Sequence, residues 1–315
     1  MPPAPDAIGS VIRHSIQKIE TTRSRRRAAN GKLRPFVLGL SGLQGSGKST
    51  WAEALAQELR TRHQLKIVIL SLDDLYHTHE SLSQIRSKNP SNKLFSNRGQ
   101  PGTHDETLAK SFFAALLAGE EVSVPSYDKS LFDGEGDRAP MSEWERVDAE
   151  PYVDVLIFEG WCVGFHALSV SEIEEKWIIS RRAGAGTVDN SPSTRMLGAH
   201  PLEHIQIINE NLRRYNDTFL GPANFDYLVH LDTDNLANVY RWRMQAEQAL
   251  RRSRGRGMAD EEVISFVQAY MPAYELYLGG LQRQAFIPDK EGDAKGNQLR
   301  VLLDQDRNVI SVTEI

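Results

Sequence analysis

The segment 42–49, with the sequence GLQGSGKS, has the residue types and the spacing of a phosphate-binding loop. Its glycines let backbone N–H groups point inward around phosphate oxygens, at the start of a helix whose dipole favours negative charge. Lys48 can reach the β- and γ-phosphates of a nucleotide, and the Ser49 hydroxyl can bind Mg²⁺. An apolar strand before the segment and a helix after it give the required context. The residues assigned to the nucleotide are Gly42, Leu43, Gln44, Gly45, Ser46, Gly47, Lys48, Ser49 and Thr50.

Three acidic residues follow apolar segments elsewhere in the chain. Asp73 and Asp74 end the segment KIVILSLDD, and Glu159 lies near the end of YVDVLIFEGW. Ligands of a doubly wound sheet bind at the carboxyl ends of its strands, so all three acids can face the phosphates. A hydroxyl acceptor needs a carboxylate to orient it and take its proton, and Mg²⁺ needs acidic support. An acid beside an apolar strand is costly unless it is used or paired, which favours function for Asp73 and Glu159. For Asp74 we favour helix capping.

A bound nucleotide leaves open what becomes of its terminal phosphate. A switch GTPase would carry an Asn/Thr-Lys-x-Asp motif late in the chain, and the sequence has none. A motor or transporter ATPase would usually end a strand in two acids, whereas the third apolar segment ends in Glu159 and then Gly160. A regulatory protein that binds ATP without turnover is a further alternative. Intact Lys48, Ser49 and Asp73 argue against it.

The elements that must position these residues follow from hydrophobic patterning. Four apolar runs, at 34–42, 66–74, 152–161 and 225–232, predict buried strands. Helices are predicted between and after them, and alternating strands and helices favour a parallel sheet with helices on both faces. The tail 298–315 predicts two strands around a turn. Segments 78–102 and 126–150 are polar and predict long loops. The predicted helices span 8–28, 48–63, 106–119, 201–219, 235–252 and 259–281.

The domain organisation predicted from these elements is simple. Residues 1–30 form an N-terminal helical extension, and residues 31–315 form one α/β domain. Residues 165–200 are predicted to be an insertion, flexible around the Gly-, Ser- and Thr-rich stretch RRAGAGTVDNSPSTR.

Composition excludes several classes of protein. The 315 residues include 37 Lys and Arg against 42 Asp and Glu, and a net charge of −5 does not favour nucleic-acid binding. No apolar run has the length needed to cross a membrane. The single cysteine, Cys162, permits no internal disulfide and fits a reducing compartment. We expect a cytoplasmic protein. The basic cluster of Arg23 and Arg25–Arg27 could serve as a nuclear or organellar address, although a solvated helix end is the preferred interpretation. The oligomeric state stays open.

The chain resembles a known family in several motifs. SLDDLYH, SYDK, FEGW and the late WRMQAE and RGRGM resemble the P-loop small-molecule kinases that include uridine kinase, phosphoribulokinase and pantothenate kinase. NRGQPGTHDETL, VPSYDKSLFDGEGDRAP and LIFEGWCVGF are similar to the D-glycerate 3-kinase group of plants and fungi. The resemblance covers about residues 35–281, without the insertion. It implies a P-loop NTPase fold with a helical lid, ATP and Mg²⁺ as cofactors, and a small-molecule substrate.

The resemblance also implies roles for individual residues. Asp73 falls at the catalytic carboxylate, and Glu159 falls at the acid that supports Mg²⁺ together with Ser49. Lys48 holds the β- and γ-phosphates and acts in catalysis.

The acceptor pocket is the least constrained part of the resemblance. Tyr76 and Tyr127 fall where relatives line this pocket, and His104 and Asp105 fall where uridine-kinase-like enzymes hold substrate hydroxyls.

An anionic acceptor also needs cations in its pocket. Arg98 and Arg138 are the main candidates, because a guanidinium can hold a carboxylate by two parallel bonds. Lys129 is a third, weaker candidate. Solvated charges in polar loops are the alternative for all three.

Arginines near residue 250 fall at the family's mobile lid. Arg241 and Arg243 lie on the predicted helix 235–252, and the stretch RGRG follows at 254–257. Arginines on a closing element stabilise the charge that spreads over the transferring phosphoryl group, and closure excludes water. A solvated basic helix end is the alternative, and we expect Arg243 to contact phosphate.

Together these features predict transfer of the ATP γ-phosphoryl group to a hydroxyl of a small acid. The resemblance selects D-glycerate, which would give 3-phosphoglycerate. A nucleoside or another hydroxy acid is the alternative acceptor.

Overall fold

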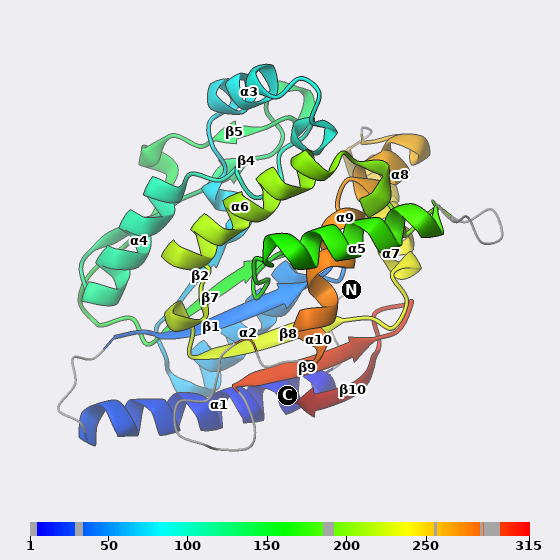
Figure 1. Cartoon of the computed structure of the whole chain (residues 1–315). Helices are drawn as coiled ribbons and strands as arrows, with labels where there is room; N and C mark the ends of the chain where they lie inside the picture. Colours follow the sequence, from blue (N-terminus) through cyan, green and yellow to red (C-terminus); the bar gives the residue numbers. More distant parts are fainter. Residues whose placement is uncertain (1–4, 29–33, 185–191, 255–256, 284–285, 287–296) are drawn as a thin grey trace.

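The computed structural model describes residues 5–28, 34–184, 192–254, 257–283, 286 and 297–315. Its centre is a six-stranded sheet with the strand order β10-β9-β8-β1-β7-β2 (Figure 1). Neighbouring strands are parallel, except that β10 pairs antiparallel with β9. The strands are β1 (Phe36–Gly42), β2 (Ile67–Ser71), β7 (Val155–Gly160), β8 (Tyr227–Asp232), β9 (Gln298–Leu303) and β10 (Val309–Glu314).

The middle strands of the sheet are apolar because both of its faces are covered. Every residue of β1, β7 and β8 is buried. Near-continuous apolar sequences such as FVLGLSG are what a parallel sheet between two helical layers requires. The predicted fold class is confirmed, as are the four buried strands and the C-terminal strand pair.

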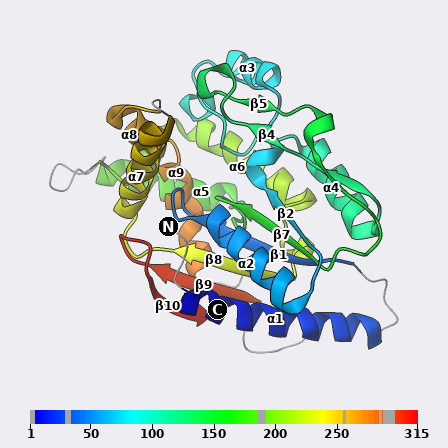
Figure 2. The same cartoon turned by 180° about the vertical axis from the view of Figure 1, so that it is seen from behind.

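Helices cover the sheet on both sides. In Figure 1, α5, α6 and the segment from α9 to α10 lie in front of the sheet, and Figure 2 shows α1 and α2 on the opposite face. Helices α7 and α8 lie beyond one end of the strands. The helices are α1 (Pro5–Ala28), α2 (Lys48–His63), α3 (His79–Lys88), α4 (Glu106–Ala118), α5 (Val170–Ala183), α6 (Leu202–Thr218), α7 (Ala237–Arg254), α8 (Asp260–Gln268), α9 (Met271–Ala273) and α10 (Gly279–Arg283).

The N-terminal helix is an integral part of this packing. Its apolar side chains Val11, Ile12 and Ile19 are buried in the common hydrophobic core. Helix α1 contacts α2 and the strands β1, β8 and β10. The extension predicted for residues 1–30 therefore lies against the sheet over its described part.

The prediction that the polar segments 78–102 and 126–150 are long loops was wrong in part. The polar segments 78–102 and 126–150 contain the helix α3 and parts of two small hairpins, β3 (Val122–Val124) with β6 (Glu145–Val147) and β4 (Tyr127–Asp128) with β5 (Asp137–Arg138). The insertion 165–200 contains α5, whose first turn is closed by a reciprocal Ser169–Glu172 capping box. Residues 185–191 of that insertion lie outside the described residues.

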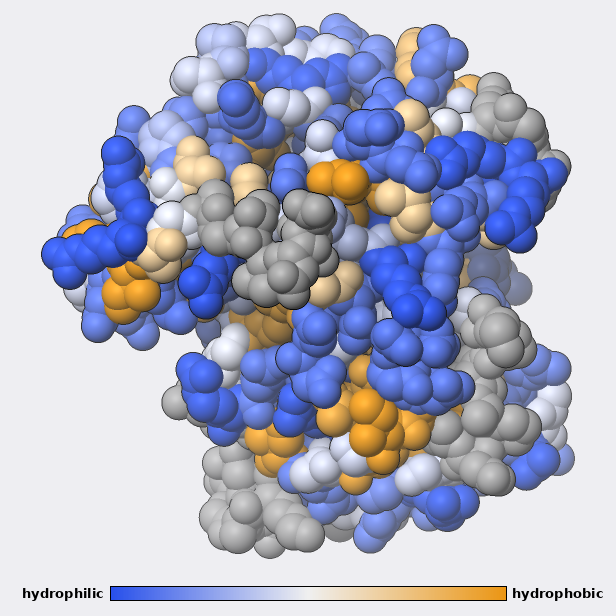
Figure 3. Space-filling view, turned by 90° about the vertical axis from the view of Figure 1, so that its right-hand side faces the viewer, coloured by the Kyte–Doolittle hydropathy of each residue, from blue (hydrophilic) through white to orange (hydrophobic). Residues whose placement is uncertain are grey.

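The surface shown in Figure 3 is mostly hydrophilic, with hydrophobic residues in separate patches. Within the described part of the chain, none of the helices combines the length and the apolar character that a membrane span needs.

Candidate active site

The phosphate-binding loop connects β1 to α2 in the predicted way. Gly45 and Gly47 have φ angles of +76° and +93°, which a residue with a side chain rarely adopts. Lys48 donates to the Leu43 carbonyl oxygen at 3.2 Å, and burial lowers the pKa of its ammonium group. The Ser46 hydroxyl is buried and has no partner within the described chain. The loop thus presents donors that a nucleotide can use.

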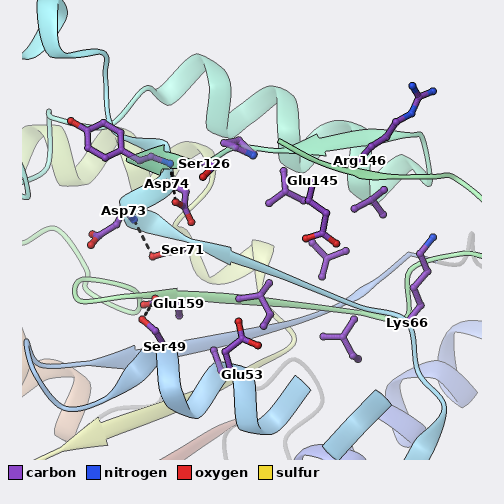
Figure 4. Close-up of a pocket in the computed structure, with 18 of the residues that line it drawn as sticks. Ser49, Glu53, Lys66, Ser71, Asp73, Asp74, Ser126, Glu145, Arg146 and Glu159 are labelled. Carbon is purple, nitrogen blue, oxygen red and sulfur yellow. Dashed lines mark hydrogen bonds between the residues drawn. The ribbon is translucent and has the colours of Figure 1, made fainter. Parts of the chain in front are cut away.

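Ser49 and Glu159 meet at the end of this loop. Glu159 is the penultimate residue of β7 and is 5% exposed. Its Oε1 accepts a hydrogen bond from the Ser49 hydroxyl at 2.8 Å. Strand β7 pairs with β1, so the carboxyl end of one strand brings the acid beside the loop that follows the other. The structure therefore brings the two predicted Mg²⁺ ligands together (Figure 4).

Asp73 does not end a strand, contrary to expectation. Strand β2 stops at Ser71, and a short 3₁₀ turn, Leu72–Leu75, carries the two acids, with the Asp73 N–H donating to the Ser71 hydroxyl at 3.3 Å. The Asp73 carboxylate accepts the Tyr76 hydroxyl at 2.9 Å and the Lys129 ammonium at 2.5 Å. Burial would raise the pKa of Asp73, but the Lys129 charge and these hydrogen bonds hold it well below its ordinary value.

Asp74 has a different environment and a different partner. It does not cap a helix; instead its carboxylate accepts the N–H of Tyr127 at 3.2 Å and so anchors β4. Burial raises the pKa of Asp74 to about 6, although this hydrogen bond and Lys129 act in the other direction. The pKa values of these two adjacent acids are therefore shifted in opposite directions: Asp74 takes up a proton below about pH 6, whereas Asp73 stays ionised there.

The aromatic residues predicted for the acceptor pocket lie beside Asp73. The Tyr76 ring stacks on His104 at 4.5 Å and meets Tyr127 edge-on at 5.2 Å between ring centroids. His104 is fully buried behind Tyr76, and its Nδ1 lies 3.1 Å from the Tyr215 hydroxyl. Burial lowers the pKa of His104 to about 3, so the ring is neutral. His104 therefore supports Tyr76 from behind.

Arg98 and Arg138, the cations predicted for the acceptor pocket, lie close to these rings and form hydrogen bonds with other residues of the protein. The Arg98 guanidinium lies over the Tyr76 and Tyr127 rings at 5.7 Å and 5.4 Å, and it donates to two carbonyl oxygens of the loop 134–135. Arg138 donates to the Asp105 carboxylate and to the Tyr76 carbonyl oxygen, both at 2.9 Å.

Asp105 is also the residue that caps α4. Its carboxylate accepts the N–H of Leu108 at 3.0 Å. With Arg138 on its other oxygen, Asp105 fixes the wall of the pocket.

Comparison with known proteins places this site in a family. No protein-family model matches the chain. An uncharacterised kinase of Schizosaccharomyces pombe is 40% identical over 276 residues, which cover 87% of this chain and 90% of that protein. The chloroplastic D-glycerate 3-kinase of Arabidopsis thaliana is 34% identical over 280 residues, covering 88% of this chain and 54% of the relative. A solved structure of a D-glycerate 3-kinase from Cryptococcus neoformans is 31% identical with a TM-score of 0.81, covering 97% and 99% of the two chains.

The chain belongs to the D-glycerate 3-kinase group of P-loop kinases. It is an ATP-dependent phosphotransferase that acts on an alcohol group of a small molecule. The Schizosaccharomyces and Cryptococcus proteins match over nearly their whole length, so the assignment rests on the complete kinase domain.

Both arginines predicted for the lid have a protein partner, and the Arg243 backbone lies close to Gly45 of the phosphate-binding loop. Arg241 pairs with Asp306 of the C-terminal strand connection at 2.8 Å. Arg243 pairs with Glu247 one turn along α7, and its guanidinium lies 4.8 Å from the Phe266 ring centroid of α8. The stretch 254–257 falls largely outside the described residues and side chains.

Sequence reasoning missed Arg307, which joins α7 to the phosphate-binding loop. Its guanidinium donates to the carbonyl oxygens of Gly45 at 2.6 Å and Trp242 at 3.0 Å. The only sequence signal was the turn Asp306–Asn308, which predicted a strand connection and no contact with the kinase loop.

An open cleft of about 1130 Å³ extends from this site along the outer edge of β2 (Figure 4). Its near end holds Asp73, Asp74 and Glu159, where the phosphates are expected. Its far end holds Lys66 and Arg146. The end of the cleft beside Asp73 is open to solvent, and the Asp73 side chain is 33% exposed.

Proposed function

We propose that this kinase transfers the γ-phosphoryl group of ATP to the 3-hydroxyl of D-glycerate. The observation that carries the proposal is the ionised Asp73, placed between the phosphate-binding loop and a pocket with cationic residues. Lys129 contacts Asp73 directly, and Arg98 lies over the adjoining tyrosine rings. An acid next to cations suits an acceptor that has both a hydroxyl and a carboxylate. The names of the Arabidopsis and Cryptococcus relatives support the same substrate.

Asp73 acts as the general base in this proposal. Its carboxylate orients the acceptor hydroxyl and takes its proton as the hydroxyl oxygen forms a bond to the γ-phosphorus. The bond from the γ-phosphorus to the β–γ bridging oxygen breaks, and ADP leaves with that oxygen. Asp73 then releases the proton to water. Its low pKa keeps it ionised before the acceptor binds.

Lys48 and the loop 42–50 hold the phosphates, and the lid completes the site. The Lys48 ammonium and the backbone N–H groups neutralise the β- and γ-phosphate oxygens. The Arg243 backbone N takes part in the contact between α7 and Gly45, so we assign the Arg243 side chain to the transferring phosphoryl group. Arg241 supports the lid through Asp306.

Ser49 and Glu159 would hold Mg²⁺. A hydroxyl and a carboxylate oxygen 2.8 Å apart beside the phosphate-binding loop are the oxygen donors that this ion prefers. When bound, Mg²⁺ neutralises charge on the ATP phosphates.

The acceptor would lie against Tyr76 and Tyr127. We assign its carboxylate to the cationic part of the pocket, which Arg98 and Lys129 form. We assign Arg138, His104 and Asp105 to the wall that holds Tyr76 in place.

The test is an ADP-release assay with D-glycerate, uridine, pantothenate and ribulose 5-phosphate as acceptors. We expect D-glycerate to stimulate release most strongly. We also expect Asp73→Asn to lower kcat by about 10²- to 10⁴-fold with little change in ATP affinity, because the base acts on the acceptor. The substrate assignment fails if D-glycerate gives no stimulation, and the base assignment fails if Asp73→Asn keeps most of the activity.

A further inference from the structure

Lys129 occupies an oxygen of Asp73 that a phosphoryl acceptor would use. The carboxylate has two oxygens: Oδ1 accepts the Tyr76 hydroxyl at 2.9 Å, and Oδ2 accepts the Lys129 ammonium at 2.5 Å. Tyr76 is 3% exposed and is held by its stacked neighbour His104, so Oδ1 faces the protein. The acceptor hydroxyl must therefore approach on the Oδ2 side, where Lys129 stands.

The Lys129 side chain can leave without a change in the backbone. It is 54% exposed and has a flexible four-carbon stem. The backbone on either side is fixed: the Tyr127 N–H donates to Asp74, and Ser130 donates its N–H and its hydroxyl to Asp128 at 2.8 Å and 2.6 Å. Moving the ammonium group off Asp73 breaks one charge-assisted hydrogen bond and leaves the loop intact.

The surrounding charges determine what can draw Lys129 away. Burial would lower the pKa of Lys129, but the carboxylates of Asp73, Glu159 and Asp74 raise it, so the ammonium group stays charged. A neutral molecule offers no negative charge in exchange for Asp73. An acceptor carboxylate offers a negative charge that can replace Asp73 as the partner of the Lys129 ammonium group. This ion pair also offsets the repulsion of the acceptor carboxylate by Asp73, Asp74 and Glu159.

The other cations of the pocket are less suited to this exchange. Arg98 holds the carbonyl oxygens of Gly134 and Glu135, and Arg138 holds Asp105. The hydrogen bonds of Arg98 and Arg138 hold the walls of the site in place, so breaking them would disturb the pocket. Lys129 instead pairs with Asp73, the proposed base, so its displacement acts directly on the base.

We propose that Lys129 is a specificity-determining residue that makes the activity of Asp73 depend on the charge of the acceptor. In the free enzyme Lys129 shields Oδ2. When an acceptor carboxylate takes the ammonium group, Oδ2 becomes available to the acceptor hydroxyl. Water and neutral alcohols do not displace Lys129 from Asp73, so Oδ2 cannot accept their proton, and ATP hydrolysis is limited. The inference rests on the proposed kinase reaction and adds the means by which a carboxylate-bearing acceptor is selected.

The test compares D-glycerate with glycerol, which has a neutral CH₂OH group in place of the carboxylate. In Lys129→Met, we expect the ratio of kcat/KM for D-glycerate over glycerol to fall about 10- to 100-fold, the range that one charge-assisted hydrogen bond supplies. ADP release without any acceptor should rise. Lys129→Arg retains the charge and should keep most of the ratio. Lys110→Met, at an exposed position of α4, is the matched control and should behave as wild type.

Equal losses with both acceptors, and unchanged ADP release without acceptor, would overturn the proposal, because a structural role lowers all turnover alike. Unchanged ATP affinity of Lys129→Met shows that the variant is folded. The acceptor-free measurement does not depend on D-glycerate. If wild type fails to phosphorylate D-glycerate but Lys129→Met still raises acceptor-free release, the substrate assignment fails and the shielding role stands. If wild type uses D-glycerate and the ratio is unchanged in Lys129→Met, the shielding role fails.

Discussion

Gly45 is the point at which the phosphate-binding loop contacts α7, the helix that we predict to belong to the lid. An alanine at this position should separate local backbone strain from the effect of this contact. A Cβ atom at Gly45 would lie 2.8 Å from Trp242 Cβ and 3.0 Å from the Trp242 carbonyl carbon, so α7 would have to shift. Gly134 provides the matched control, since its φ of +97° is also left-handed but a Cβ atom there meets nothing within 4 Å.

The two substitutions share one cost and differ in the other. A left-handed residue with a side chain costs about 1–2 kcal/mol, and both variants incur this cost. Overpacking against α7 adds about 1–3 kcal/mol for Gly45→Ala alone. The gain from a less flexible unfolded chain applies to both variants and cancels in the comparison.

We therefore expect Gly45→Ala to lower the free energy of unfolding by about 2–5 kcal/mol and Gly134→Ala by about 1–2 kcal/mol. Urea denaturation measures both values. ATP affinity, measured by titration calorimetry, should fall at least about tenfold in Gly45→Ala, because 1.4 kcal/mol of distortion at the loop is enough for that factor. It should be unchanged in Gly134→Ala. Equal destabilisation and equal ATP affinity in the two variants would refute the contact between loop and lid.

Two further predictions concern buried acidic groups near the site. Burial raises the pKa of Asp74 to about 6 from 3.8, so between these pH values the folded protein binds more protons than the unfolded chain, and the free energy of unfolding falls as the pH rises. Asp74→Asn should therefore stabilise the protein at pH 8 by up to about 3 kcal/mol and have little effect at pH 4, as urea denaturation at both pH values will show. Burial raises the pKa of the Cys162 thiol well above its ordinary range, so iodoacetamide should label Cys162 only after unfolding, and rapid labelling of the native protein in mass spectra would contradict this.

The parts of the fold that the sequence predicts are those with a strong local pattern. Strands such as β1 and β7 are continuous apolar runs. In the loop 42–49, the spacing of Gly42, Gly47, Lys48 and Ser49 is specific to phosphate-binding loops. Helix α3 was missed because its sequence HESLSQIRSK is almost wholly polar and only Leu82 is buried. The segment EVSVP predicts the short strand β3. Its partner β6 and the hairpin of β4 with β5 were missed, because polar strands of two or three residues have no periodicity to detect.

The identities of the site residues were easier to predict than their pairings. Asp73 and Lys129 are 56 residues apart in the chain, and Gly45 and Arg307 are 262 residues apart. Nothing near Lys129 in the sequence SYDKS indicates that its ammonium group pairs with the proposed base. Asp74 illustrates the same limit: its position suggested a helix cap, whereas its partner is the N–H of Tyr127 in a separate hairpin.

The contacts of Arg307 constrain how a lid on α7 can move. Trp242 is fully buried, and Arg307 links its carbonyl oxygen to that of Gly45. The first turns of α7 are therefore fixed to the phosphate-binding loop and to the C-terminal strand pair. Arg307 also donates to the Gln245 side chain at 2.7 Å. If α7 and α8 form the lid, we therefore expect it to move beyond Gln245, in the later turns of α7 and in α8, where the ion pair between Arg251 and Asp260 joins the two helices. We expect a lid of this form to keep the contact at Gly45, in which the Arg243 backbone takes part, so that only the Arg243 side chain has to turn from Glu247 toward the phosphates.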